Sequence, residues 1–175
     1  MNPTTAVGLS SLIMLALAAF TGEKRPTIQP APAEVSYYRA ELHGDLHASP
    51  RGTATFGAVG GDGAQAVFTL SLGADGTNGS VLFTRMNGAR LVPGTYVISD
   101  RDDDSDEIRA LVITGTASQA TGVFRGQSGY LIVTSATDNV IQGRFQVDAK
   151  GFLASNPADE SRPMQATGMF TATRD

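Results

Sequence analysis

The chain has 175 residues, of which 41% are hydrophobic and 17% charged; this composition predicts one globular domain and excludes a disordered polyelectrolyte. The net charge is −4 and no basic run is longer than Lys24-Arg25, which argues against a nucleic-acid partner. Because there is no cysteine, disulfides, thiolate metal sites, a cysteine nucleophile and a lipid-bearing cysteine are excluded.

The N-terminal segment is typical of an export signal. Residues 6–20 form an apolar run that is short for a transmembrane helix and suits a signal peptide. Ala16-Leu17-Ala18 resembles a cleavage site, so we assign residues 1–22 to the signal and expect the mature chain to start near Ala19. Residues 1–5 carry no Lys or Arg, which leaves an uncleaved N-terminal anchor as the main alternative, ahead of a buried helix.

Residues 23–34 are predicted to be a linker. Pro26, Pro30 and Pro32 remove backbone donors and hold the chain extended. We therefore expect the folded domain over residues 35–175, outside the cytoplasm and with no transmembrane segment in the mature chain.

Beyond residue 35, apolar and polar side chains alternate with a period of two, which is typical of β-strands. In residues 67–72, for example, Phe68, Leu70 and Leu72 point to one side and the residues between them to the other. Nine such segments are separated by turn-forming residues: 35–42, 53–59, 66–72, 80–86, 94–99, 108–114, 129–135, 140–149 and 164–174. The sequence predicts an all-β domain, a single antiparallel β-sandwich or small β-barrel of about nine or ten short strands.

A Gly-x-Phe pattern recurs in the C-terminal half, at Gly122-Val-Phe124, Gly143-Arg-Phe145 and Gly168-Met-Phe170. In a strand, the phenylalanine lies on the same face as the glycine, which has no side chain. We expect a strand bend or packing of phenylalanine over glycine, with a ligand-binding role as the alternative.

The segment GYLIVTSATDNVIQGRFQVDA, followed by MQATGMFTATR, resembles the end of uncharacterised exported bacterial β-domains, many of them lipoproteins. These domains often end in two strands with the Gly-x-Phe pattern, and the resemblance covers the C-terminal third of the chain. It implies an all-β exported module and brings no catalytic residue with it. The lipid anchor of the lipoproteins is not implied, because the chain has no cysteine.

An acidic stretch places aspartates at alternate positions, Asp100, Asp102, Asp104 and Asp106. These match the first four oxygen ligands of an EF-hand loop, but Ser105 replaces its glycine and Leu111 its closing glutamate. The stretch is either a hydrated hairpin loop that discourages edge pairing or a weak calcium site. An unchanged melting temperature at millimolar calcium would exclude the calcium site.

The only two histidines lie in a His-x-Asp-x-His pattern formed by His43, Asp45 and His47. On an extended strand these side chains would project to one side and could bind zinc or another transition metal. Gly44 favours a turn or bulge that would break this alternation, so surface histidines are the simpler interpretation.

Little in the sequence points to catalysis. It has no G-x-S-x-G motif, and the glycines of residues 60–63 are not followed by the G-K-[ST] of a phosphate-binding loop. A pair of carboxylates that cleaves glycosides would come from distant strands, and nothing singles out Glu41, Asp45 or Asp148 for it.

The sequence therefore favours an exported, non-enzymatic binding or structural module at the bacterial cell envelope. Its expected partner is an envelope component or a small ligand, and calcium is the one candidate cofactor. A lipocalin-like carrier of a small apolar ligand is the first alternative, and a glycan hydrolase is the second.

Overall fold

The computed structural model describes residues 35–60, 66–73, 78–101, 107–116 and 118–175. The predicted signal and linker, residues 1–34, lie outside the described residues. Across the described ranges, no helix is long and apolar enough to cross a membrane.

The described residues form ten β-strands and no helix, which confirms the predicted all-β class. The strands are β1 (Tyr37–Gly44), β2 (Arg51–Gly52), β3 (Ala54–Val59), β4 (Val67–Leu72), β5 (Gly79–Arg85), β6 (Gly94–Val97), β7 (Ile108–Thr116), β8 (Gln119–Ala136), β9 (Val140–Leu153) and β10 (Arg162–Arg174). Nine of them overlap the nine expected segments, because period-two alternation is a strong signal for strands.

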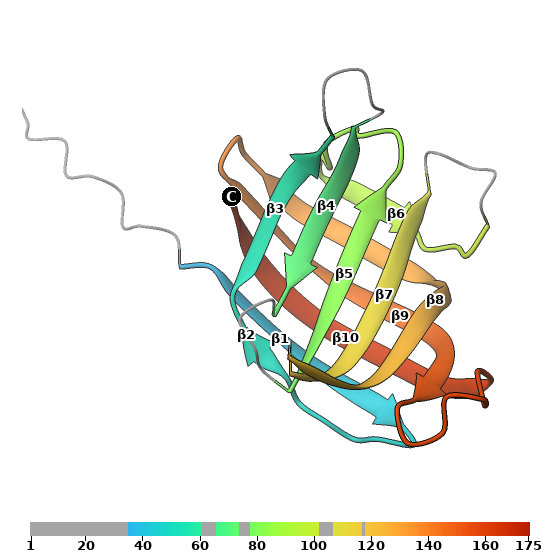
Figure 1. The fold of residues 1–175 in the computed structure, drawn as a ribbon. Helices are drawn as coiled ribbons and strands as arrows, with labels where there is room; N and C mark the ends of the chain where they lie inside the picture. Colours follow the sequence, from blue (N-terminus) through green and yellow to red (C-terminus); the bar gives the residue numbers. More distant parts are fainter. Residues whose placement is uncertain (1–34, 61–65, 74–77, 102–106, 117) are drawn as a thin grey trace, which may run out of the picture. The chain divides into compact units, whose positions relative to one another are not determined.

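Seven strands close into a ring, in the order β3, β4, β5, β7, β8, β9, β10 and back to β3. All neighbours are antiparallel except the closing pair, in which Thr173 and Arg174 of β10 run parallel to Thr55 and Phe56 of β3. Figure 1 shows β3, β4, β5 and β7 in front, with β9 and β10 crossing behind them. The other three strands attach to this ring: β1 pairs with β10, β2 with β1, and β6 with β8.

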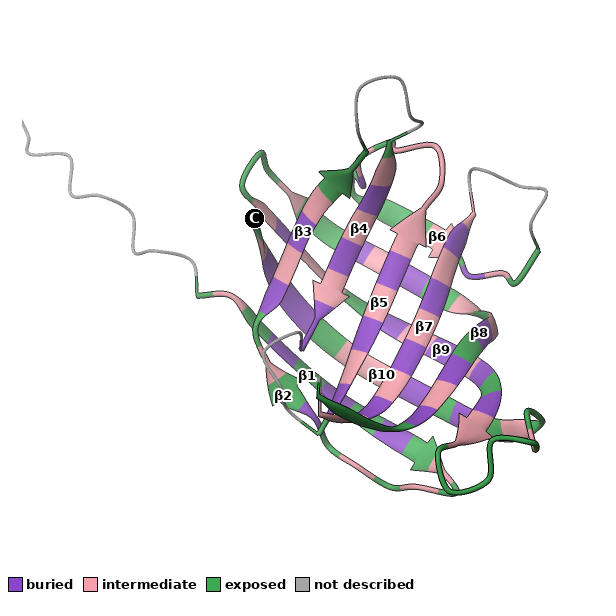
Figure 2. Ribbon diagram, in the orientation of Figure 1, coloured by how far each residue is buried: buried purple, intermediate pink, exposed green. Residues whose placement is uncertain are grey.

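Alternate residues of the strands point into the ring and form the core, as the alternating colours of Figure 2 show. The largest fully buried side chains are Tyr38, Phe83, Phe124, Phe170, Leu42, Leu70, Leu72, Leu91, Ile98, Ile108, Leu131 and Ile141. Burying each large apolar side chain contributes about 1.5–3 kcal/mol relative to leaving it exposed. Leu91 is the one member of this set that comes from the connection between β5 and β6.

The Gly-x-Phe residues of β9 and β10 interlock across the strand pair. Phe145 lies opposite Gly168, and Phe170 lies opposite Gly143. A Cβ atom on Gly168 would lie 2.6 Å from Cζ of Phe145, and one on Gly143 would lie 2.9 Å from Cζ of Phe170. Each ring thus occupies the space that the opposite glycine leaves, which confirms the expected packing of phenylalanine over glycine.

The sequence underestimates the length of β8, which begins at Gln119 rather than near residue 129. The expected segment covers only residues 129–135, whereas Gly122, Gly126 and Gly129 all lie inside one continuous strand. The register with β9 shifts between Gly126 and Ser128, and Gly129 has a φ of +132°. The strand therefore bends at a bulge instead of ending. The sequence does not predict β2, because a strand of two residues is too short to show the alternation of apolar and polar side chains.

Substituting Gly168 with alanine is expected to destabilise the domain by about 1–3 kcal/mol, because the new methyl group overpacks the core. Its Cβ would lie 2.5 Å from the backbone oxygen of Arg39 as well as against Phe145. The free energy of unfolding, measured by denaturant titration, tests this.

Gly57→Ala is the matched control, since a Cβ on this strand glycine would meet nothing closer than 3.9 Å. It should leave stability unchanged or raise it slightly. Equal losses for the two variants would contradict the interlocked packing.

Candidate ligand-binding face

The register of the strands places outward side chains in rows on the outer face of β2, β1, β10 and β9. One row runs through Arg51, Arg39, Met169 and Arg144, one residue from each strand in that order. The three arginines are exposed, and Met169 is 38% exposed. We name these four residues the arginine row.

The arginines of this row are not paired with a carboxylate among the described residues. Across the part of the chain that the structure describes, Arg39, Arg51 and Arg144 make no ion pair and no side-chain hydrogen bond. Arg39 and Arg51 are direct cross-strand neighbours, an arrangement in which like charges destabilise a sheet. The stability of the fold therefore does not explain the arginine row, which makes it the strongest candidate for a binding site.

Two arginines elsewhere in the domain, Arg90 and Arg162, are used structurally. Arg90 forms an ion pair with Asp138, with Nη1 2.8 Å from Oδ1, and its guanidinium lies 5.5 Å from the ring centroid of Phe56. Such contacts fix a side chain to the fold. Among the described residues Arg125 and Arg174 also form no ion pair, so the arginine row is set apart by the register, which brings its three arginines to one level.

The next row on the same face carries Glu41 of β1, Thr167 of β10, Gln146 of β9 and Tyr130 of β8. The Tyr130 hydroxyl, on a side chain that is 39% exposed, donates a hydrogen bond of 3.1 Å to Oε1 of Gln146. The Ser49 hydroxyl donates to the Glu41 carboxylate at 2.5 Å. Residues of the two rows line a hollow of about 540 Å³.

A second hollow, of about 490 Å³, lies further along the same strands. Its lining includes His43 of β1, Gln165 of β10, Asp148 and Lys150 of β9, and Ser128 of β8. Nε2 of Gln165 donates a hydrogen bond of 2.9 Å to Oδ1 of Asp148. The whole face thus combines guanidinium, amide, hydroxyl and carboxylate groups with exposed aromatic rings, those of Tyr130 and Tyr37.

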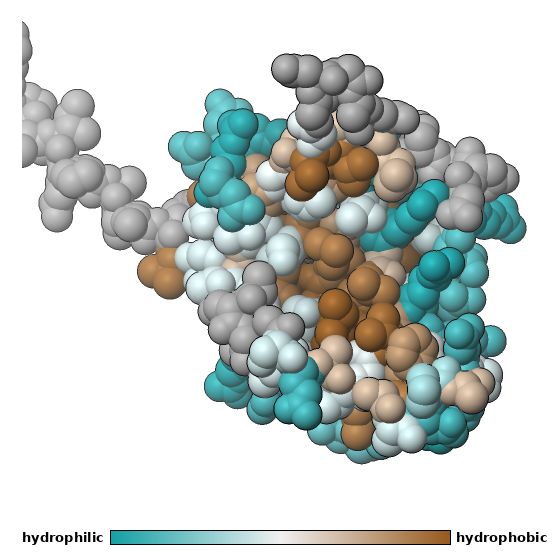
Figure 3. Space-filling view, in the orientation of Figure 1, coloured by the Kyte–Doolittle hydropathy of each residue, from teal (hydrophilic) through white to brown (hydrophobic). Residues whose placement is uncertain are grey.

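The opposite outer face is more apolar. Leu82 of β5 and Leu111 and Ile113 of β7 are partly exposed there. Figure 3 shows apolar side chains gathered on this side of the molecule, over β5 and β7. These residues shield one another across the strand pair.

The predicted calcium residues can be located only in part. Asp100 is exposed and lines a hollow of about 270 Å³ beside Arg125. Asp102, Asp104 and Asp106 lie outside the described residues. The calcium site therefore stays a prediction.

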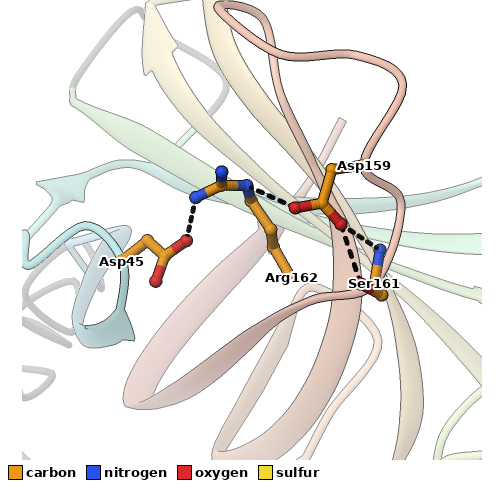
Figure 4. Close-up of polar contacts among 4 residues, drawn as sticks. All are labelled: Asp45, Asp159, Ser161 and Arg162. Atoms are coloured by element: carbon orange, nitrogen blue, oxygen red, sulfur yellow. Dashed lines mark hydrogen bonds and ion pairs between the residues drawn. The ribbon is translucent and has the colours of Figure 1, made fainter.

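The His-x-Asp-x-His residues lie at the end of β1 and in the connection that follows it. The rings of His43 and His47 meet edge to face with centroids 5.6 Å apart. Asp45 instead forms an ion pair with Arg162, which also contacts Asp159 (Figure 4). Within the described ranges, no group of three His, Asp or Glu side chains is placed to hold a metal ion.

This network joins the connection after β1 to the connection before β10. Nε of Arg162 lies 3.2 Å from Oδ2 of Asp159, and the Ser161 hydroxyl donates to Oδ1 of Asp159 at 2.7 Å. The hydrogen bonds from the side chain and backbone of Ser161, with the nearby positive charge of Arg162, lower the pKa of Asp159 below its ordinary value of 3.8. The network thus holds the two connections together through side-chain contacts.

No family model, curated protein or solved structure gave a significant match to this chain. The candidate site therefore depends on the geometry and chemistry of the arginine face alone.

Sequence reasoning missed the arginine row, because its members lie far apart in the chain and only the strand register aligns them. The one local signal is the alternation in β1, which places Arg39 and Glu41 on the face opposite to the buried Tyr38 and Ala40. Nothing in the sequence indicates that Arg51 pairs with Arg39 or that Arg144 falls in the same row.

Asp159→Asn is expected to lower the melting temperature at neutral pH, since the ionised carboxylate accepts the hydrogen bonds from Ser161 and pairs with Arg162. Because the folded-state pKa is depressed, this stabilisation is present above the unfolded-state pKa and is lost as the pH falls through the folded value. The difference from the wild type should therefore shrink below about pH 4, in melts recorded at a series of pH values.

Ser161→Ala is the companion variant, because it removes the largest cause of the shift and should weaken this acid dependence. A difference between Asp159→Asn and the wild type that stays constant into strong acid would contradict the role of the carboxylate charge.

Proposed function

We propose that this domain is a non-enzymatic binding module that is exported to the cell envelope and binds an anionic ligand through its arginine row. The observation that carries the proposal is the set of three exposed arginines on one row that form no ion pair with any described residue. Guanidinium groups bind carboxylates and phosphates with two parallel hydrogen bonds. An anion that binds there would relieve the repulsion between Arg39 and Arg51.

Export is supported by the apolar leader and the proline-rich segment. The resemblance of the C-terminal strands to exported bacterial β-domains agrees with it. An envelope location would also bring the domain next to anionic surface polymers.

The packing of the ring interior favours a surface binder over a lipocalin-like carrier. A carrier needs open space among its inward side chains. Here phenylalanine rings occupy the space beside Gly143 and Gly168, and Leu91 adds a further buried side chain to the core. Two hollows, of about 540 and 490 Å³, lie on the outer face of β1, β10 and β9.

A glycan hydrolase, the second alternative from the sequence, moves ahead of the carrier, because Glu41 and Asp148 lie on the same outer face. Glu41 is on β1 and Asp148 on β9, with β10 between them. Each carboxylate accepts a hydrogen bond from a neutral group, Ser49 or Gln165. The binding proposal uses these carboxylates only as hydrogen-bond acceptors.

The double variant Arg39→Gln/Arg144→Gln is expected to lose most of its affinity for anionic polymers, at least about tenfold, because each lost charge-assisted contact is worth about 1.5–3 kcal/mol. Binding to immobilised polyanions at low and high salt measures this. The wild type should bind more weakly at high salt, since exposed charges are screened.

Arg174→Gln is the matched control, because Arg174 lines a different hollow beside Phe56 and Phe68. It should bind as the wild type does.

Arg51→Gln provides a second test, since relief of like-charge repulsion should leave the free energy of unfolding unchanged or raise it by about 0.2–1 kcal/mol. If no anionic polymer binds to the wild type, the proposed function is wrong.

A further inference from the structure

We infer that the ligand of the arginine row is an acidic polysaccharide, one that bears carboxylates among free hydroxyl groups. This inference rests on the proposed function and adds the chemical class of the ligand. It follows from the direction of the row, the groups beside it and the carboxylates on the same face.

The arginine row runs across the strands, not along them. Arg51, Arg39 and Arg144 lie on three strands at one level of the register, so they span three strand spacings, about 14 Å. A peptide that adds to a sheet lies parallel to an edge strand and is held by backbone hydrogen bonds. Such a peptide at β2 would not reach Arg144, which lies three strands further in.

The groups beside the row suit sugar rings. Tyr130 presents an aromatic ring whose orientation is fixed by its hydrogen bond to Gln146, and Met169 lies between two of the arginines. A pyranose ring has an apolar face of C–H groups that packs on aromatic and thioether surfaces, and a rim of hydroxyls that bonds to amides. Gln146 and Thr167 supply amide and hydroxyl groups next to the row.

The carboxylates on this face disfavour a dense polyanion. Glu41 lies two residues from Arg39 on the same side of β1, and Asp148 lies further along β9. These groups would repel the closely spaced phosphates of a nucleic acid or polyphosphate. A polysaccharide that bears carboxylates among hydroxyls can place its carboxylates at the arginines. Its hydroxyl groups can donate hydrogen bonds to Glu41.

The test uses the full-length chain and four probes in calorimetric titrations: an oligogalacturonate long enough to span the row, a neutral malto-oligosaccharide of equal length, poly-L-glutamate and a single-stranded DNA oligonucleotide. The oligogalacturonate should bind at least about tenfold more tightly than each of the other three. Arg39→Gln/Arg144→Gln should abolish this preference. Tyr130→Ala should weaken oligogalacturonate binding without changing any residual binding of poly-L-glutamate.

Equal binding of oligogalacturonate and either poly-L-glutamate or DNA, with Tyr130→Ala unchanged, would overturn the polysaccharide inference and leave the anion-binding proposal standing. Failure of every anionic probe to bind would overturn both. Release of reducing ends from the oligogalacturonate would support the ligand class and overturn the non-enzymatic proposal. Melting curves of each variant confirm folding, and Arg174→Gln serves as the variant that should retain all binding.

Discussion

The structure depends on one strand, β10, which makes the pairings that close the ring. Its residues pair with β1 and β9 over most of its length, and its last two residues pair with β3. The interlock between Phe145 and Gly168, and between Phe170 and Gly143, fixes the register of β9 against β10. A shift of the register by one residue would turn every inward side chain of β10 outward. The stabilisation from burying that face of the strand would then be lost.

This fixed register also determines the outer face. Since inward and outward residues alternate, locking Phe170 and Ala166 into the core fixes Met169 and Thr167 on the outside. The rows that cross β1, β10 and β9 are therefore as well defined as the core itself. A binding surface made of such rows is preorganised by the packing beneath it, and ligand binding would not have to order the backbone.

The sequence could predict the strands but not their partners. Alternation in β4, where Phe68, Leu70 and Leu72 are buried, is a local property and was enough to place the strand. The full length of β8 is not predicted, because a glycine such as Gly126 or Gly129 permits both a turn and a bulge inside a strand.

The pairing of Arg39 with Arg51 and the alignment of Arg144 depend on register between distant segments, about which one sequence carries no local signal. The packing of phenylalanine over glycine is predicted in part: less fully than the strands, but better than the arginine row. The Gly-x-Phe spacing indicates the residues involved, and the pairing of β9 with β10 supplies their partners.

Electrostatics explains why a protein with a net charge of −4 can still hold an anion on one face. Screening at physiological ionic strength limits the reach of exposed charges to about 8 Å, so the acidic residues of other surfaces contribute little at the arginine row. Near the row, which spans about 14 Å, the charges are three guanidiniums and the Glu41 carboxylate, which Ser49 already engages. Such a surface attracts moderately charged ligands that also form hydrogen bonds, and its selectivity comes from the neutral groups between the arginines as much as from the arginines themselves.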